Sequence, residues 1–155
     1  MTATDSYEFV LSRDPFVIRR TVRWADCDPA GIVFTGRFPE YVLSAASLFT
    51  AHMANGSMHE VTRTLGVDMP CKGMTYEFQH SLWPGDVFDI HCHVGEIRTH
   101  TYDIHCTGKK PDGTAIFAAT VSPICIKKEV RQRVPIPQTL RDIFAQHQNS
   151  VGVKP

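Results

Sequence analysis

The residues best suited to chemistry in this chain form one short run, Asp26-Cys27-Asp28-Pro29-Ala30-Gly31-Ile32-Val33-Phe34. Proline fixes its own backbone and glycine permits a tight turn, so we expect the Asp28 carboxylate on a rigid loop. A predicted helix begins directly after the run, and the first N–H groups of a helix carry partial positive charge without a partner. This pairing suits attack on a carbonyl carbon: the carboxylate attacks or activates water, and an amide stabilises the oxyanion.

The same run also has a simpler structural interpretation. Asp-Pro sequences commonly form turns in which the aspartate side chain accepts a hydrogen bond from a nearby backbone amide. The residue types alone leave both roles open for Asp28. We expect Gly31 to serve the conformation of the loop, with close approach of its backbone to a substrate as the alternative.

Periodicity on both sides of the run predicts the elements that must hold it. Alternating apolar residues over 16–25 predict a strand, and helical spacing over 37–54 predicts a long helix with one wide apolar face. Thr35 is the expected N-cap of this helix, and Asn55-Gly56 its end. Further elements are predicted as a short helix over 59–65, strands over 74–82, 88–94, 102–106 and 114–128, and a polar helix from 138 to about 148. Pro123 predicts a bulge or an edge position in the last of these strands.

One strand, one long apolar helix and four meandering strands predict an α+β fold, in which an antiparallel five-stranded sheet wraps around the helix. The chain has 155 residues and 43% apolar content, which is typical of one globular domain. We place this single domain at residues 16–148, after a loosely ordered lead-in at 1–15 and before a C-terminal tail at 149–155.

Composition excludes several classes of partner. Lys plus Arg and Asp plus Glu balance at 16 each, so no net charge favours nucleic acid or an acidic membrane. Residues 1–14 lack the apolar core of a signal peptide, and no apolar run approaches the ~20 residues of a membrane helix. The five cysteines are widely spaced, without a Cys-x-x-Cys pair. These features predict a cytoplasmic protein with reduced thiols.

The run from Asp26 to Val33 resembles the signature of hotdog-fold acyl-CoA thioesterases of the 4-hydroxybenzoyl-CoA thioesterase type, and the order of the predicted elements fits that family over residues 18–140. The resemblance implies a hotdog fold and hydrolysis of an acyl-CoA to the free acid and coenzyme A, without a metal or redox cofactor. It also implies a homodimer or homotetramer with active sites between subunits. Two other functions stay open: hydrolysis of acyl groups carried by acyl carrier protein, and acyl-CoA binding without catalysis.

The resemblance assigns roles to individual residues. Asp28 takes the place of the family's essential carboxylate, as nucleophile or as general base, and Asp26 that of an accompanying structural carboxylate. The backbone amide of Thr35 takes the place of the oxyanion donor. That position is Tyr or His in two branches of the family, whereas this chain has Phe34-Thr35. The family's phosphate-binding positions fall on Arg98, His100 and Arg133, with Lys127, Lys128 and Arg131 as neighbours that could replace them.

Two further groups allow a functional and a structural interpretation. Aromatic residues near the run could line an acyl pocket, although such spacing is more typical of core: Phe34, Phe38, Phe49, Tyr76 and Phe78. With Gly31, Phe34 is our candidate for substrate contact. Histidines on the outer face of a predicted hairpin, with His91 opposite His105 and His93 opposite Asp103, could hold zinc. A solvated face or a subunit contact is the alternative, and we predict no metal.

Overall fold

The computed structural model describes residues 6–148. Its helices and strands follow one another as β1 (Glu8–Arg13), β2 (Phe16–Thr21), α1 (Phe38–Met53), α2 (Met58–Leu65), β3 (Val67–Asp68), β4 (Cys71–Phe78), β5 (Val87–Ile97), β6 (Tyr102–Lys109), β7 (Ala115–Pro123), β8 (Ile126–Lys127) and α3 (Gln138–Ala145). Two short 3-10 turns, Trp24–Asp26 and Thr35–Arg37, stand between β2 and α1. Within residues 6–148, no helix is both long and apolar enough to cross a membrane.

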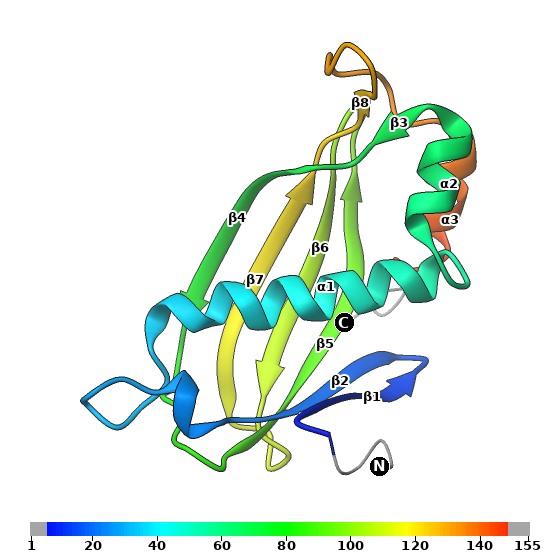
Figure 1. Ribbon diagram of the computed structural model, residues 1–155. Helices are drawn as coiled ribbons and strands as arrows, with labels where there is room; N and C mark the ends of the chain where they lie inside the picture. The colour runs from blue at the N-terminus through cyan, green and yellow to red at the C-terminus, as the bar shows by residue number, and fades with distance from the viewer. Residues whose placement is uncertain (1–5, 149–155) are drawn as a thin grey trace.

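Six strands form one antiparallel sheet in the order β1-β2-β5-β6-β7-β4, and α1 lies across one face of it (Figure 1). This confirms the predicted sheet around a long helix, with one strand more than the five expected. The additional strand is β1, which lies in the segment predicted as a loosely ordered lead-in. Its residues are half-buried or exposed, so they lack the apolar alternation that marks an inner strand. The predicted tail at 149–155 lies outside the described residues.

Helix α1 forms where its apolar spacing predicts it. The buried residues recur at three- and four-residue intervals and face the sheet: Phe38, Tyr41, Val42, Ala45, Ala46, Phe49 and Met53. Pro39 lies in the first turn, where its missing N–H costs nothing. The predicted N-cap is wrong, because Thr35 begins a separate 3-10 turn and Arg37 occupies the cap without a side-chain hydrogen bond. The helix therefore starts three residues after Thr35.

The hairpin of β5 and β6 has a different register from the one predicted. His93 pairs with His105 and His91 with Thr107, so Asp103 is not opposite His93. A tight connection explains the difference, because the amide of Arg98 donates to the carbonyl of Thr101 at 2.8 Å. A bulge between Val94 and Ile97 then shifts the remaining pairs.

Strand β4 is an edge of the sheet, since within the described chain it pairs with β7 alone. Most of its eight residues are exposed. Pro123 ends β7 opposite an irregularity between Cys71 and Gly73, which lies in β4 and not in the strand that carries Pro123. The strand leads from Cys71, beside the β3–β8 end of the molecule, to Phe78, beside the start of α1.

Candidate active site

The run that contains Asp28 forms a closed loop between β2 and α1. Cys27 and Val33 pair as an antiparallel bridge, and the amide of Asp28 donates to the carbonyl of Ile32 at 3.0 Å. Gly31 has a φ of +83°, a conformation that residues with a side chain rarely adopt. Apart from Gly31 and its two neighbours in the chain, no described residue comes within 4 Å of the position of a Cβ at Gly31, so backbone conformation and not close packing requires this glycine. The bridge places Asp28 in the turn at the tip of the loop.

The side chain of Asp28 has both a structural contact and an open oxygen. Its Oδ1 accepts a hydrogen bond from the amide of Ala30 at 2.9 Å, which is the turn contact expected from Asp-Pro sequences. Its Oδ2 accepts no hydrogen bond within residues 6–148, and the residue is half-buried. The carboxylate is thus fixed through one oxygen while the other can reach a ligand.

The first two backbone amides of the 3-10 turn Thr35–Arg37 have no hydrogen-bond acceptor among the described residues. The amide of Phe34 donates to the carbonyl of Asp26 at 2.9 Å, and that of Arg37 donates to the carbonyl of Phe34 at 2.8 Å. Between them, the amides of exposed Thr35 and Gly36 have no acceptor in the described part of the chain. The ring of Phe34 lies against Gly36, where a Cβ would come within 2.4 Å of it. These two amides are therefore available to an oxyanion.

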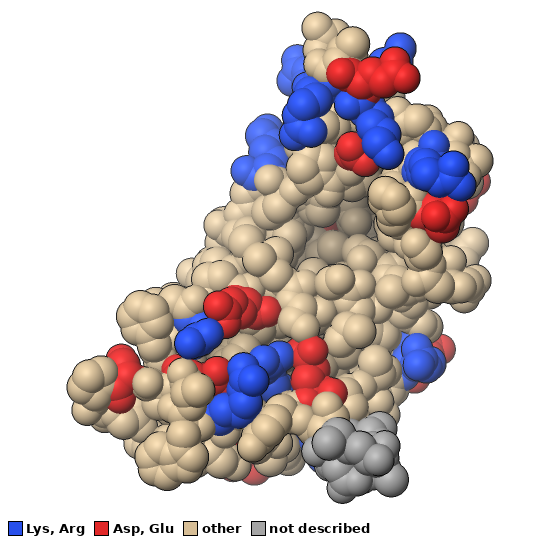
Figure 2. Space-filling model, viewed as in Figure 1, with Lys and Arg blue, Asp and Glu red and all other residues tan. Residues whose placement is uncertain are grey.

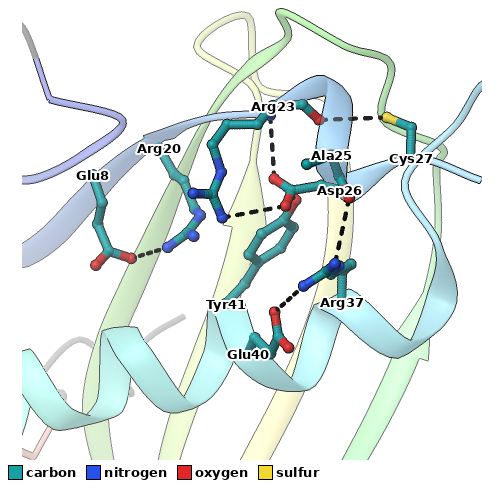
Figure 3. A network of polar contacts seen from close by, with 9 residues as sticks. All are labelled: Glu8, Arg20, Arg23, Ala25, Asp26, Cys27, Arg37, Glu40 and Tyr41. Carbon is teal, nitrogen blue, oxygen red and sulfur yellow. Dashed lines mark hydrogen bonds and ion pairs between the residues drawn. The ribbon is translucent and has the colours of Figure 1, made fainter.

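Asp26 connects the start of the loop to Arg23 and to Tyr41 of α1 (Figure 3). The carbonyl of Asp26 accepts a hydrogen bond from the amide of Phe34. The Asp26 side chain is 1% exposed, and its carboxylate accepts hydrogen bonds from the hydroxyl of Tyr41 at 2.8 Å and the amide of Arg23 at 3.2 Å. Burial raises the pKa of Asp26, but the hydrogen bonds from Tyr41 and Arg23 outweigh it and lower the pKa below its ordinary value. Asp26 is therefore an ionised structural anchor in the neutral range.

We expect Tyr41→Phe to make the protein less stable to acid. A carboxylate whose pKa is lowered by folding contributes stability above its unfolded pKa, and this contribution is lost as pH falls through the folded pKa. Without the Tyr41 hydroxyl the folded pKa of Asp26 rises, so acid unfolding should begin at higher pH, with about 1–2 kcal/mol of stability lost at neutral pH. Circular dichroism during acid titration measures both effects.

Tyr102→Phe is the matched control for this experiment. Tyr102 is also buried, at 2% exposure, but its hydroxyl makes no hydrogen bond to a described residue. An equal shift of acid unfolding in both variants would contradict the role given to the Tyr41–Asp26 bond.

The predicted aromatic group separates into core residues and exposed rings, with Tyr76 half-buried and stacked on the exposed ring of Phe78. Phe38 and Phe49 are core residues, at 5% and 1% exposure. Phe34 and Phe78 are 53% and 48% exposed, and Phe78 packs edge-on against Phe38 at the start of α1. The sequence did not point to Trp83, which is 48% exposed. Trp83 directly follows Leu82, whose carbonyl accepts a hydrogen bond from the loop amide of Val33. Exposed aromatic rings are thus found at the end of the loop, next to its partner Leu82 and at the start of α1.

The three predicted phosphate-binding residues line one cleft. This cleft, of about 260 Å³, lies at the β3–β8 end of the molecule and is formed by Lys72, Arg98, Thr99, His100, Thr101, Ile124 and Arg133. The substitutes named from the sequence, Lys127, Lys128 and Arg131, are exposed near it, and basic side chains gather over this end (Figure 2). The structure therefore groups these residues into one basic region.

Arg98 differs from the other cations of the cleft, because carboxylates already neutralise it. Its guanidinium binds both oxygens of Asp103, at 2.6 and 3.0 Å, and an oxygen of Glu96 at 3.0 Å. These contacts raise the pKa of Arg98 above its ordinary value. No ion pair within residues 6–148 involves the other cleft cations, Arg133 and Lys72. Lys72 was missed because nothing in the strand pattern of β4 marks it.

The cleft residues belong to the β3–β8 end of the molecule, and the loop between β2 and α1 lies at the opposite end (Figure 1). Strand β4 connects the two regions, with Lys72 of the cleft near its first residue and Phe78, beside the start of α1, at its last. A strand of eight residues is about 25 Å long. A single chain therefore does not bring the two regions together.

Two of the three outer-face histidines, His93 and His105, lie side by side, whereas His91 pairs with Thr107. The rings of His93 and His105 lie 5.1 Å apart, and Nδ1 of His105 is 3.0 Å from the Thr120 hydroxyl. Burial, with His105 beside it, lowers the pKa of His93. Nowhere in the part of the chain that the structure describes do three His, Cys, Asp or Glu residues group so as to hold a metal ion.

Comparison with known proteins shows the family of this chain. A family model described as the Thioesterase-like superfamily matches residues 22–144. The 1,4-dihydroxy-2-naphthoyl-CoA hydrolase of Thermosynechococcus vestitus is 25% identical over 122 residues, covering 79% of this chain and 83% of that protein.

Solved structures agree in fold. A 1,4-dihydroxy-2-naphthoyl-CoA thioesterase from Synechocystis has a TM-score of 0.74 at 17% identity, over 90% of this chain and 98% of that one. A Staphylococcus aureus protein in complex with CoA has a TM-score of 0.77 at 15% identity, over 97% and 92%. Because the family model covers most of the chain, this protein belongs to the thioesterase-like superfamily, as a thioester hydrolase of the hotdog fold.

Proposed function

We propose that the protein hydrolyses acyl-CoA thioesters, with Asp28 as the reacting carboxylate and the amide of Thr35 as oxyanion donor. The observation that carries this proposal is the loop between Cys27 and Val33, which fixes Asp28 through one oxygen and leaves the other open. The unpaired amides of Thr35 and Gly36 follow on the same loop. A carboxylate and amide donors held by one rigid segment suit attack on a carbonyl carbon.

Two routes to the products use the same groups. In one, Asp28 attacks the thioester carbon, coenzyme A leaves as the thiolate and takes up a proton, and water hydrolyses the mixed anhydride. In the other, Asp28 accepts a proton from a water molecule as that water attacks the carbonyl, and the tetrahedral intermediate then expels coenzyme A as the thiolate, which takes up a proton. Negative charge develops on the thioester oxygen in both, where the Thr35 amide would donate a hydrogen bond. Neither route requires a metal or redox cofactor.

Exposed aromatic side chains beside the loop favour an aromatic acyl group. Phe34 and Phe78 present large apolar surfaces there, as does Trp83. The Thermosynechococcus vestitus relative is named for a naphthoyl-CoA substrate. Flat rings stack favourably on such side chains, so we propose an aryl-CoA as substrate.

Thiol release from a panel of acyl-CoA esters tests the function. The panel should contain benzoyl, hydroxybenzoyl, naphthoyl, phenylacetyl, and short and medium aliphatic esters. We expect the highest kcat/KM for an aromatic ester. Tight binding of every ester without thiol release would contradict the enzymatic function and favour a binding protein.

We further propose that the basic cleft binds the phosphates of coenzyme A through Lys72, His100 and Arg133. Arg98 would shape the cleft, because Asp103 and Glu96 already neutralise its charge. Exposed cations without an internal ion pair bind phosphate at lower cost than cations that must first break one.

The Lys72→Ala/Arg133→Ala double variant should raise KM for acyl-CoA by about three- to tenfold, since charge-assisted bonds at exposed sites contribute modestly. Its KM for the matching acyl-pantetheine, which lacks the nucleotide phosphates, should not change. Measuring KM for both substrates decides this point. An equal rise with both would mean that these cations do not bind the nucleotide.

The separation of loop and cleft supports a dimer with composite sites. A two-fold axis that pairs the free edge of β4 with β4 of a second copy would reverse the strand direction. The Phe78 end of one copy, with its loop, would then lie beside the Lys72 end of the other. Each active site would combine Asp28 of one subunit with the basic cleft of its partner.

Acyl carrier protein is a second candidate source of the acyl group. The exposed cations near the cleft offer a docking surface for an acidic carrier domain: Lys127, Lys128, Arg131 and Arg133. A carrier-linked substrate would be hydrolysed faster than the same acyl-CoA and would lose this advantage at high salt. We propose a cytoplasmic setting for either reaction, since all five cysteines are free.

A further inference from the structure

We propose that Glu8 of β1 is a positioning residue, which acts through Arg20 and Tyr41 on Asp26 and so holds the Asp28–Thr35 loop in its reactive shape. This inference rests on the proposed function and adds a role for β1, the strand beyond the five that the sequence predicts. The residues concerned form a continuous line from β1 to the loop (Figure 3).

The first step of this line joins β1 to the interior. A carboxylate oxygen of Glu8 binds Nη1 of Arg20, and the other accepts a hydrogen bond from the hydroxyl of Ser44 in α1 at 2.6 Å. The side chains of Glu8 and Arg20 are only 21% and 12% exposed. Nε of Arg20 is buried without a hydrogen-bond partner in the described chain, so Glu8 is the group that compensates this charge.

The second step passes through an aromatic ring. The guanidinium carbon of Arg20 lies 4.6 Å from the centre of the Tyr41 ring, a cation–π contact in a buried setting. Glu8 holds the guanidinium at this ring face. If Glu8 loses its charge, the unpaired guanidinium can leave the ring towards another acceptor, and the ring loses a contact that fixes its orientation.

The third step reaches the reacting groups. The Tyr41 hydroxyl donates to Oδ2 of Asp26, whose own carbonyl accepts from the amide of Phe34. Asp26 is two residues before Asp28, and Phe34 directly precedes Thr35. A shift of Asp26 therefore moves the reacting carboxylate and the oxyanion donor relative to each other.

The test compares two isosteric variants, Glu8→Gln and Asp89→Asn. Asp89 forms a similar pair with Arg19 of β2, at 2.7 and 2.9 Å, but belongs to the opposite face of the sheet and has no contact with the loop. For the preferred acyl-CoA, we expect Glu8→Gln to lower kcat about tenfold with KM nearly unchanged, because small misplacements of reacting groups affect the chemical step. Asp89→Asn should keep the wild-type kcat.

Hydrogen exchange gives a second readout that does not depend on activity. The amides of Asp28 and Phe34 bond to the carbonyls of Ile32 and Asp26 respectively, so their exchange reports the shape of the loop. We expect the amides of Asp28 and Phe34 to exchange faster in Glu8→Gln than in the wild type. In Asp89→Asn they should exchange at the wild-type rate. Ser44→Ala, which removes one contact of Glu8, replaces Glu8→Gln if that variant does not fold.

The outcomes separate the two proposals. Wild-type kcat and loop exchange in Glu8→Gln, or equal losses in both variants, would overturn the positioning role while leaving the thioesterase function intact. A wild-type protein without thiol release would refute the proposed function, and loop exchange in Glu8→Gln would still decide whether β1 holds the loop.

Discussion

Asp28→Asn should reduce thiol release from the preferred acyl-CoA by about 1,000-fold, which lies within the contribution of a positioned acid–base group. An amide can neither attack the thioester as a carboxylate does nor accept a proton from water. Its oxygen can still accept the hydrogen bond from the amide of Ala30, so the loop should keep its shape. Single-turnover kinetics with the purified variant measure the loss.

Asp112→Asn is the control for this substitution. The Asp112 carboxylate also accepts a hydrogen bond from the amide two residues later, that of Thr114, at 2.9 Å. Asp112 lies in the turn between β6 and β7 and contacts no proposed site residue. The Asp112→Asn variant should therefore be as active as the wild type. If Asp28→Asn retained wild-type kcat with unchanged substrate binding, Asp28 would be a turn residue only.

Mixing two defective homodimers should restore activity if each site combines two subunits. One parent carries Asp28→Asn. The other carries Lys72→Ala/Arg133→Ala and keeps about a tenth to a third of the wild-type activity at substrate concentrations far below KM, where the rate follows kcat/KM. In the mixed dimer, the intact Asp28 of one chain faces the intact cleft of the other, and one of the two sites is whole. After unfolding and refolding together, random pairing should bring the activity to about 30% of the wild-type value, whereas the parents without exchange of subunits give about 5–17%.

The alternative arrangement gives a different result. If Asp28 and the cleft of the same chain served one site, every site in the mixture would carry a defect, and the activity would be that of the parents. A mixture of Asp28→Asn with the wild type controls for the efficiency of exchange, since its loss of activity reports the pairing. Activity at the parental level despite proven exchange would contradict the composite site.

Local patterns in the sequence predicted the elements well where burial is one-sided. The spacing of Phe38, Tyr41, Val42, Ala45 and Phe49 marks α1, because only one face of this helix contacts the sheet. Alternation marks β5 and β6 in the same way. Strand β1 escaped prediction, since a half-exposed edge strand needs no such pattern. The predicted β5–β6 register was wrong because the position of the tight connection between Arg98 and Thr101, and the bulge between Val94 and Ile97, leave no local sign in the sequence.

For the candidate site, the sequence determined the loop and its reactive residue types. Asp28, Pro29 and Gly31 encode a turn through their own backbone preferences, which act over a few residues. The same locality kept two interpretations of Asp28 open, and the structure contains features of both, with one oxygen in the turn contact and one free.

Only the tertiary structure decided which distant residues meet. It grouped Lys72 with His100 and Arg133, neutralised Arg98 with Asp103, and connected Glu8 to Asp26 through α1. It also placed the loop and the basic cleft at opposite ends of β4. The physical reason is that side-chain periodicity reports which face of an element is buried, whereas contacts between elements depend on register, bulges and packing across the whole sheet.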